Sequence, residues 1–340
     1  MLFLADCGPQ VGGGHVMRCL SLAQALVDRG AACAIVETPE VARVLAAFAA
    51  PGIERLAAGG GLLHELVGAA RDHASRWQAH VVVVDHYGMA ADQERFLGAP
   101  IVVIDDLADR AHRCGLLIDP SLGRDARDYA RLTPVGARIL TGPAYALLSP
   151  VYAQARAEIL AGRRPDIPPR RLLVSLGLMD LKGITGRVLH LLEPQLDGLQ
   201  IDVVVGGQAG SLPWLRRLAS RDPRLRLHVD TVRMASLLGE ADVGVGAGGS
   251  STWERAALGL PSLCVILADN QRALALELDR RGACLAVETA GAGLAEALTN
   301  AFGRLLEDGA LRRRLSETSA AVCDGQGAAR AAAAVLALAS

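Results

Sequence analysis

The sequence of 340 residues has few aromatic side chains, since Phe, Trp and Tyr together make up only 3% of it. Hydrophobic residues nevertheless amount to 51%, so alanine, leucine and valine must supply most of the packing in any core. Charged residues amount to 21%, a balance typical of globular rather than disordered chains. Because the chain is about twice as long as a usual domain, we expect two domains with cores of ordinary size.

An excess of charge of either sign is also absent, because the formal net charge is −1. No block of Lys and Arg and no basic stretch with interleaved aromatics occurs, so we expect no nucleic-acid partner. The first residues lack a basic leader and reach an acid at Asp6, which argues against a signal peptide. The apolar stretch 331–339 is far shorter than the ~20 residues that span a bilayer, so no membrane association is expected.

The seven cysteines are odd in number, widely spaced and free of any C-x-x-C pair. That pattern suggests neither a disulfide framework nor a structural zinc site. It fits a reduced, cytoplasmic location best. We expect no metal and no cofactor, and a protein that functions as a monomer.

Short apolar runs alternate with longer amphipathic stretches from end to end of the chain. The runs lack polar alternation and are bounded by Asp, Gly or Pro, as buried parallel strands are. This rhythm predicts an α/β fold built from doubly wound, Rossmann-like sheets. The predicted strands are 2–5, 34–36, 81–84, 101–104, 116–118, 139–140, 172–175, 201–205, 225–229, 243–245, 263–266 and 285–287.

The segment 163–171 interrupts the rhythm with prolines and charges, so it is interpreted as a linker. We therefore expect an N-terminal domain over 1–162, a C-terminal domain over 172–325 and a closing helix over 326–340. Two α/β halves imply an interdomain cleft, and ligands in such folds bind beyond the carboxyl ends of the strands. The candidate functional residues should therefore lie in the loops that follow strands.

The first such loop, over 8–19, is rich in glycine and leads into a helix. Its glycines allow close backbone approach, but Met17 stands where a dinucleotide fingerprint needs its third glycine. His15 and Arg18 are three residues apart at the helix start and can face the same way. A neutral imidazole there is suited to act as a general base near pH 7. The alternatives are a packing histidine, or an NAD site with Glu37 as the ribose acid.

The second glycine loop, over 245–255, runs from a strand into hydroxyl residues that can cap a helix. Free amides and the positive end of the helix dipole favour an anion such as a diphosphate. No Gly-Lys-Ser/Thr follows, so the loop is not a P-loop. Glu254 is placed to accept hydrogen bonds from a ribose diol. The alternative is an ordinary capped helix with an exposed glutamate.

Three further groups of polar residues follow predicted strands. Asp269, Asn270 and Gln271 can bind sugar hydroxyls or amides, or simply start a helix. Asp85-His86-Tyr87 and Asp105-Asp106 are acidic clusters that suit sugar contact or loop capping. Mg or Mn binding is the less favoured alternative, because no third ligand can be placed.

Taken together, these motifs resemble the blocks of PseG-type UDP-sugar hydrolases, which make the sialic-acid-like pseudaminic acid used on flagellin. The blocks run from Asp6 to Gln271 and so cover most of the chain. The second glycine loop alone is shared with MurG-like glycosyltransferases. The similar blocks are Gly12-x-Gly14-His15-x-x-Arg18-Cys19-Leu20-x-Leu22-Ala23, Asp85-His86-Tyr87-Gly88, Ile104-Asp105-Asp106-Leu107-Ala108-Asp109-Arg110, Leu140-x-Gly142-Pro143-x-Tyr145-Ala146-Leu147-Leu148, Gly246-Ala247-Gly248-Gly249-Ser250-Ser251-Thr252-x-Glu254 and Leu258-Gly259-Leu260-Pro261.

The resemblance implies a GT-B-like arrangement in which the C-terminal half binds the nucleotide. It implies hydrolysis of UDP-2,4-diacetamido-2,4,6-trideoxy-β-L-altropyranose by inverting attack of water at the anomeric carbon, without a metal. His15 would activate the water, the loop over 248–252 would hold the diphosphate, and Glu254 would bind the ribose. Met234 would border the uracil. The implied substrate-binding residues are Gly14, Arg18, Asp85, Tyr87, Met234, Gly248, Gly249, Ser250, Ser251, Thr252, Glu254, Asp269, Asn270 and Gln271.

One loop departs from the family pattern. Where those enzymes have a Gly-Gly-x-Asp-Pro-like loop, this chain has Leu178 and Met179 in place of small or polar residues. This departure affects the predicted identity of the sugar more than the predicted hydrolysis reaction. The other functions considered are a MurG-like glycosyltransferase, a non-catalytic nucleotide-sugar-binding protein and, least favoured, an NAD oxidoreductase.

Overall fold

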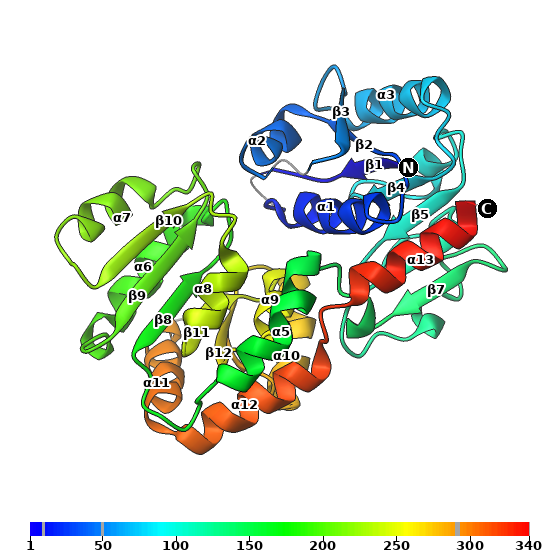
Figure 1. Cartoon of the computed structure of the whole chain (residues 1–340). Helices are drawn as coiled ribbons and strands as arrows, with labels where there is room; N and C mark the ends of the chain where they lie inside the picture. Colours follow the sequence, from blue (N-terminus) through cyan, green and yellow to red (C-terminus); the bar gives the residue numbers. More distant parts are fainter. Residues whose placement is uncertain (9–10, 49–50, 290–292, 340) are drawn as a thin grey trace. The chain divides into compact units, whose positions relative to one another are not determined.

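The computed structural model describes residues 1–8, 11–48, 51–289 and 293–339. The chain divides into two compact units (Figure 1). Unit 1 combines Met1–Pro150 with Gly325–Ser340, and unit 2 comprises Val151–Asp324. Each unit is built on its own parallel sheet, and each is described by itself below.

The sheet of unit 1 has seven parallel strands in the order β3-β2-β1-β4-β5-β6-β7. The order runs outward in opposite directions from β1 and β4, so the switch point of the sheet lies between these two strands. The strands are β1 Leu2–Ala5, β2 Cys33–Glu37, β3 Ile53–Ala57, β4 Val82–Asp85, β5 Ile101–Ile104, β6 Leu116–Asp119 and β7 Arg138–Thr141. The helices are α1 Gly14–Val27, α2 Pro39–Ala47, α3 Leu63–Arg76, α4 Ala91–Glu94 and α13 Gly327–Ala339, with short 3-10 helices η1 Ala126–Tyr129 and η2 Pro143–Tyr145.

Both faces of this sheet are buried under helices. Successive residues of β1 point to opposite faces, so Phe3 packs in the core beneath α1 and α13 while Leu4 packs in the core on the α3 side. A strand that is apolar at every position is what two buried faces require. The predicted apolar runs in this half all form strands. The edge strand β3 was not predicted, because its mostly exposed residues carry Glu54 and Arg55 and no buried apolar run.

Unit 2 has six parallel strands in the order β10-β9-β8-β11-β12-β13, with its switch point between β8 and β11. The strands are β8 Arg171–Ser175, β9 Gln200–Val205, β10 Leu225–Val229, β11 Val243–Ala247, β12 Ser262–Ile266 and β13 Leu285–Glu288. The helices are α5 Pro150–Gly162, α6 Ile184–Leu192, α7 Leu212–Ala219, α8 Met234–Glu240, α9 Ser251–Ala257, α10 Asp269–Arg280, α11 Leu294–Glu307 and α12 Gly309–Val322, with 3-10 helices η3 Leu181–Gly183 and η4 Glu193–Gln195. The prediction of two doubly wound α/β halves is confirmed.

The transition between the units lies at Pro150, whereas the sequence placed it at 162. Helix α5 and the segment 163–171 belong to unit 2. The Arg163 guanidinium donates hydrogen bonds to the carbonyls of Leu258 at 2.6 Å and Leu238 at 2.8 Å. These carbonyls lie at or next to helix C-termini, where a cation is favourable. The segment resembles a linker in sequence because it is rich in proline and charge, and Arg164, Asp166 and Arg170 are indeed exposed. Arg163, by contrast, caps helices of unit 2 and ties the segment to that unit.

Helix α13 forms within the predicted closing segment and packs in unit 1, against α1 and β6. Its alanines are small enough for the helix to lie close to α1, and Ala331, Ala332 and Val335 are fully buried there. Ser340 lies outside the described residues. Within the part of the chain that the structure describes, no helix is long and apolar enough to cross a bilayer.

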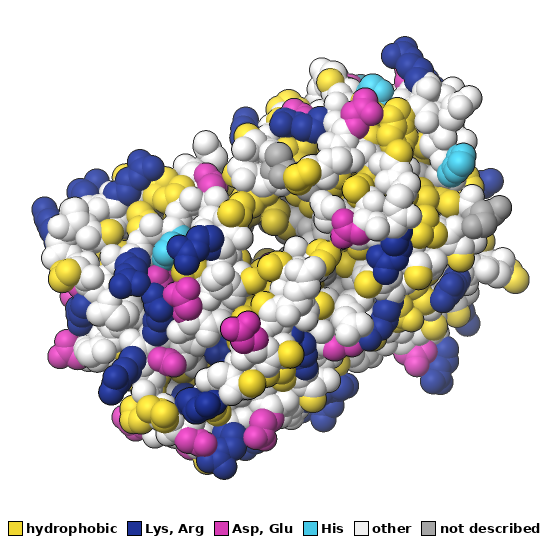
Figure 2. Space-filling model, in the orientation of Figure 1, with side chains coloured by type: hydrophobic (Ala, Val, Ile, Leu, Met, Phe, Trp, Pro, Cys, Tyr) yellow, Lys and Arg dark blue, Asp and Glu magenta, His cyan; other side chains and the backbone are white. Residues whose placement is uncertain are grey.

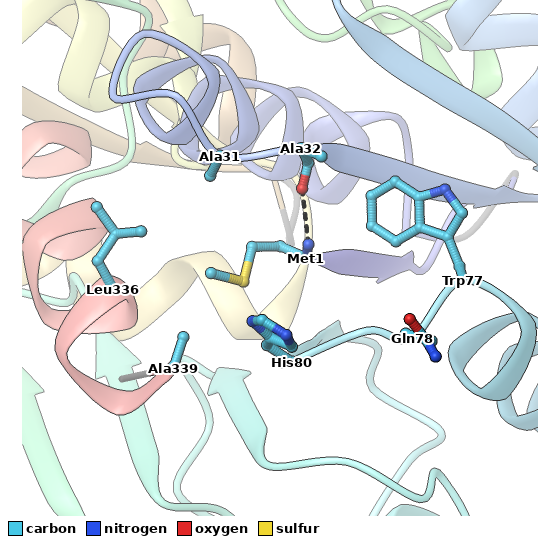
Figure 3. A pocket seen from close by; sticks show the side chains of 8 residues that line it. All are labelled: Met1, Ala31, Ala32, Trp77, Gln78, His80, Leu336 and Ala339. Carbon is cyan, nitrogen blue, oxygen red and sulfur yellow. Dashed lines mark hydrogen bonds between the residues drawn. The ribbon is translucent and has the colours of Figure 1, made fainter.

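Charged side chains of both signs are interspersed on the face of each unit that Figure 2 shows. A cavity of about 450 Å³ opens in unit 1, lined by Met1, Ala31, Ala32, Trp77, Gln78, His80, Leu336 and Ala339 (Figure 3). The terminal amine of Met1 donates to the Ala32 carbonyl at 2.7 Å beside it. Apart from Leu336 and Ala339 of α13, the lining residues directly precede β1, β2 or β4, so the cavity lies at the amino edge of the sheet. Ligands of such folds bind at the opposite edge.

Candidate active site

The first glycine loop turns the chain from β1 into α1. Gly12 has a φ of 75°, a conformation that side chains rarely adopt, and its amide donates to the Gly8 carbonyl at 2.8 Å. Helix α1 then begins at Gly14, so His15 lies in its first turn. Pro9 and Gln10 of the predicted loop lie outside the described residues. The loop thus places His15 at the carboxyl edge of the sheet, next to its switch point.

His15 is hydrogen-bonded to Asp85, the last residue of β4. Its Nδ1 lies 2.6 Å from the Asp85 Oδ1, and the imidazole is only 5% exposed. Ala5 of β1 pairs with Asp85 in the sheet, which explains how residues so distant in sequence meet. A carboxylate can only accept, so this shorter contact makes Nδ1 the donor, although the Arg18 Nη2 lies 3.1 Å from the same Nδ1. The neutral ring then carries its lone pair on Nε2. No residue within the described ranges hydrogen-bonds to that Nε2, which is therefore arranged as a general base.

Arg18 fixes Asp85 from the other side. Its Nε lies 2.5 Å from the Asp85 Oδ2, its Nη2 2.6 Å from Oδ1, and its Nη1 2.7 Å from the Asp106 Oδ2. Burial alone would raise the pKa of Asp85, but the charges and hydrogen bonds of Arg18 and His15 outweigh it and hold the pKa well below its ordinary value. Arg18 was predicted to bind substrate. That role stays a prediction, and in the structure its guanidinium keeps Asp85 charged.

Tyr87 and Asp106 complete the surroundings of His15. The Tyr87 ring meets the imidazole edge-on, with ring centroids 4.5 Å apart and planes at 87°. Its hydroxyl donates to the Asp106 Oδ1 at 2.8 Å, and the Arg110 guanidinium lies 6.0 Å from its ring centroid. The sequence placed Tyr87 and Asp106 in clusters suited to sugar contact or loop capping but gave Arg110 no role. The block that Arg110 shares with Asp106 after β5 was the signal that pointed to it.

The acidic clusters bind cationic and hydroxyl groups of the protein itself. The Asp105 Oδ2 accepts a hydrogen bond from the Tyr129 hydroxyl at 2.8 Å, while its Oδ1 lies 2.8 Å from Arg110. Burial would raise the pKa of Asp105, yet Arg110 and hydrogen bonds keep it lowered. Among the described residues, no group of three His, Cys, Asp or Glu side chains could hold a metal ion. The geometry thus gives no support to the metal alternative at these clusters.

In unit 2 the second glycine loop connects β11 to α9. The amides of Gly249, Ser250 and Ser251 donate to no acceptor within the described ranges, whereas the Gly248 amide is bonded to the Val265 carbonyl at 3.1 Å. The buried Thr252 hydroxyl donates to the Ala247 carbonyl at 3.0 Å. Where the sequence predicted an anion cradle, three amides at the start of α9 are therefore available to an acceptor, while Gly248 and Thr252 are bonded within unit 2.

Arg255 holds this loop in place, a role the sequence did not reveal. Its Nη2 donates to the Ala247 carbonyl at 2.7 Å and to the Thr252 hydroxyl at 3.1 Å, and its Nη1 to the Ser251 hydroxyl at 3.2 Å. The guanidinium is buried. The guanidinium packs directly against the backbone of Gly246, where there is room for it only because glycine has no side chain. A Cβ built on Gly246 would lie 2.2 Å from the Arg255 Nη1. The spacing of four residues from Ser251 on one helix was the available signal.

Glu254 lies one turn into α9, beside Tyr152 of α5. Burial raises the pKa of Glu254 to about 7, although the Tyr152 hydroxyl and Arg255 favour its charged form. Tyr152 is itself buried, and burial together with Glu254 raises the pKa of its phenol. Met234 starts α8, which packs against α9, and is partly exposed. Glu254 thus lies on the helix that follows the glycine loop and Met234 on a helix packed against it, and their ribose and uracil contacts stay predictions.

The third predicted group starts α10. Gln271 caps the turn, because its Oε1 accepts the Leu267 amide at 3.1 Å. The Gln271 Cβ lies only 3.2 Å from the position that a Cβ on Gly248 would occupy, so the second and third loops are in contact. Asp269 and Asn270 are exposed at the same edge. The structure thus brings two of the predicted loops together and gives Gln271 a structural contact.

The loop with Leu178 and Met179 is held by the buried Asp180. Its carboxylate accepts the Thr185 amide at 2.8 Å and the Ser211 amide at 2.9 Å. Leu178 and Met179 are both partly exposed after β8, the strand beside β11. They add apolar surface at the switch point of unit 2.

The two doubly wound sheets and the loops beyond their carboxyl ends define the class: this is a protein with the GT-B fold. MurG of Acinetobacter baumannii matches over 99% of both chains with a TM-score of 0.61 and 17% identity. S. aureus MnaA in its UDP co-structure covers 99% of this chain and 96% of its own, with a TM-score of 0.69 and 12% identity. Os79 of O. sativa, solved in complex with UDP, matches over 100% of both chains with a TM-score of 0.69 and 14% identity.

Two curated relatives narrow this class. The UDP-2,4-diacetamido-2,4,6-trideoxy-beta-L-altropyranose hydrolase of Campylobacter jejuni is 23% identical over 286 residues, which cover 83% of this chain and 97% of that enzyme. The spore coat polysaccharide biosynthesis protein SpsG of Bacillus subtilis is 28% identical over 192 residues, or 56% of each chain. No family model matches. The resemblance to PseG-type hydrolases predicted from the motifs is confirmed.

Proposed function

We propose that this protein hydrolyses a UDP-linked diacetamido-trideoxy sugar to the free sugar and UDP, as a step in pseudaminic acid biosynthesis. The observation that carries the proposal is the buried His15–Asp85 pair, which leaves one imidazole nitrogen free at the switch point of unit 1. The similarity to the Campylobacter hydrolase over most of both chains supports the same reaction. UDP-2,4-diacetamido-2,4,6-trideoxy-β-L-altropyranose is the proposed substrate.

The proposed chemistry begins at the free Nε2 of His15. Nε2 takes a proton from a water molecule as the water oxygen forms a bond to the anomeric carbon. The bond from that carbon to the diphosphate oxygen breaks on the opposite face, so the configuration inverts and the electron pair leaves with UDP. Asp85 stabilises the imidazolium that forms, because it stays charged and accepts the Nδ1 proton.

The nucleotide would bind in unit 2. The free amides at the start of α9 would stabilise the charge that develops on the departing diphosphate. Glu254 would accept the ribose hydroxyls, Met234 would border the uracil, and Asp269 and Asn270 would contact the sugar. Developing charge is neutralised by fixed protein donors in this scheme, so the proposed reaction does not require a metal.

Incubation of the protein with the UDP-sugar alone tests the proposal. We expect UDP release without any added acceptor, near-complete loss of turnover in His15→Ala, and retention of UDP binding by that variant. His80→Ala is the matched control, because His80 is exposed at the amino edge of the same sheet (Figure 3). Absence of UDP release from the wild-type protein without an acceptor would refute the hydrolase proposal.

The second candidate is a MurG-like glycosyltransferase, favoured by the match to MurG over the whole chain. Such an enzyme would release UDP only when an acceptor is supplied. A third candidate, a non-catalytic nucleotide-sugar-binding protein, would bind the UDP-sugar and leave it intact. Product analysis by NMR, with and without acceptor, separates the three outcomes.

A further inference from the structure

A second histidine lies beside the His15 site, in the cluster that the sequence assigned to sugar contact or loop capping, and takes no part in the proposed reaction. His86 directly follows Asp85 at the carboxyl end of β4. Its Nδ1 lies 3.0 Å from the backbone nitrogen of Gly88. A backbone N–H can only donate, so Nδ1 accepts this bond and the proton of the neutral ring lies on Nε2.

The surroundings of His86 hold the ring in this state. The ring packs over Gly88, where a Cβ would lie 3.1 Å from its Cε1. Asp6 lies 3.7 Å from Nδ1, but its Oδ2 accepts the Tyr87 amide at 3.3 Å. Burial and the charges of His15 and Arg110 lower the pKa of His86, against the opposite effects of Asp6 and Asp85. The neutral ring with a proton on Nε2 is therefore favoured.

His86 and His15 thus present opposite groups at one edge of the sheet. His15 donates from Nδ1 to Asp85 and offers an acceptor at Nε2, whereas His86 accepts at Nδ1 and offers a donor at Nε2. The His86 side chain is 17% exposed, and its Nε2 has no hydrogen-bond partner anywhere in the described ranges. A donor held in a fixed, largely buried position without a protein partner is arranged to meet a ligand acceptor.

We propose that the Nε2–H of His86 donates a hydrogen bond to an oxygen of the substrate's sugar, a hydroxyl or an acetamido carbonyl. This inference rests on the proposed function, because it requires the sugar to lie beside His15. The nucleotide makes no use of His86, since its cradle is in unit 2. His86 accordingly contributes to the affinity for the UDP-sugar and leaves the affinity for UDP itself unchanged.

The two nitrogens of His86 can be tested separately. In His86→Asn the side-chain oxygen can replace Nδ1 and accept the Gly88 amide, but the donor at Nε2 is lost. In His86→Gln the amide nitrogen can reach the position of Nε2, while the bond to Gly88 is lost. If His86 only holds the turn, His86→Asn should bind the UDP-sugar like the parent and His86→Gln should bind it more weakly. If His86 contacts the sugar, His86→Asn should bind the UDP-sugar more weakly and His86→Gln should bind it nearly as well as the parent.

The experiment is isothermal titration of the full chain with UDP and with UDP-2,4-diacetamido-2,4,6-trideoxy-β-L-altropyranose, in a His15→Ala background that prevents turnover. We expect His86→Asn to weaken UDP-sugar binding about 3- to 10-fold, the value of one neutral hydrogen bond, with UDP binding unchanged. His86→Gln should recover most of the sugar affinity at a lower Tm. Circular dichroism and Tm verify that both variants fold.

Equal UDP-sugar affinity in His86→Asn and its parent would overturn the inference, as would equal affinity of the parent for UDP and UDP-sugar. Failure of the proposed function appears elsewhere, as absence of UDP release by the wild-type protein. A protein that binds the sugar through His86 but releases no UDP would retain the inference and lose the hydrolase assignment.

Discussion

The Asp85→Asn substitution tests the arrangement at the centre of the proposed mechanism. Asp85 is fully buried and accepts hydrogen bonds from His15 and from two nitrogens of Arg18. Asparagine has the same shape but no charge, and its NH2 can donate to His15 Nδ1. The imidazole proton would then move to Nε2 and remove the base, so we expect turnover to fall about 10²- to 10⁴-fold.

The same change should also destabilise unit 1. Removing one partner of a buried ion pair costs about 3–5 kcal/mol, and Arg18 keeps its bond to Asp106, so we expect the lower end of this range. The pKa of Asp85 is lower in the folded than in the unfolded protein. Its stabilisation is therefore present above the unfolded pKa of about 3.9 and is lost as the pH falls below it. The difference in unfolding free energy between the two proteins should shrink in acid.

UDP release measures turnover, urea unfolding at pH 7 and about pH 3 measures stability above and below the unfolded pKa of Asp85, and calorimetry measures UDP affinity, which we expect to be unchanged. Glu94→Gln is the matched control, because Glu94 is fully buried and lies 2.7 Å from the Nδ1 of His112 in the same unit. It should lose comparable stability and keep its turnover. Turnover of Asp85→Asn within about threefold of the control would refute the reasoning.

Three further predictions concern other parts of the chain. Glu254→Gln should flatten the pH dependence of Tm. Folding raises the pKa of Glu254 from 4.5 to about 7, so the wild-type protein loses stability as the pH rises between these values, and the variant should not. Differential scanning calorimetry from pH 4 to 8 measures the difference in Tm. Arg255→Lys should weaken UDP binding about tenfold, because lysine cannot reproduce the fork that holds Ala247 and Thr252; calorimetry showing unchanged affinity would contradict this. Gly327→Ala should lower stability by about 2–4 kcal/mol in urea unfolding, since its Cβ would lie 2.2 Å from the Ala146 carbonyl oxygen; an unchanged unfolding midpoint would count against the close packing of α13.

Much of the fold could be predicted because buried parallel strands are encoded locally. A strand covered on both faces must be apolar throughout, so runs such as 81–84 identify themselves. The edge strand β3 has no such requirement and was missed. The affiliation of α5 was also missed, because Arg163 resembles a solvent-exposed residue in sequence and becomes a helix cap only through tertiary contacts.

The candidate site was predictable in its loops but not in its bonds. Glycines before a helix and a histidine in its first turn indicated which loops form the candidate site. That Arg18 bonds to Asp85 depends on the pairing of β1 with β4, which no local pattern specifies. The proton positions on His15 and His86 depend on which partner each Nδ1 meets. That the Gln271 carbonyl caps a turn was not predicted, and its sugar contact stays a prediction.

The placement of α13 in unit 1 has a consequence for synthesis of the protein on the ribosome. The core beneath α1 includes Ala331 and Val335, which are made only after all of unit 2. A nascent chain that has completed Met1–Pro150 thus carries an apolar face awaiting its last helix, while the contiguous unit 2 can fold as it emerges. The unit that contains His15 is begun first and completed last, so a chain truncated before α13 would retain His15 on an unfinished core.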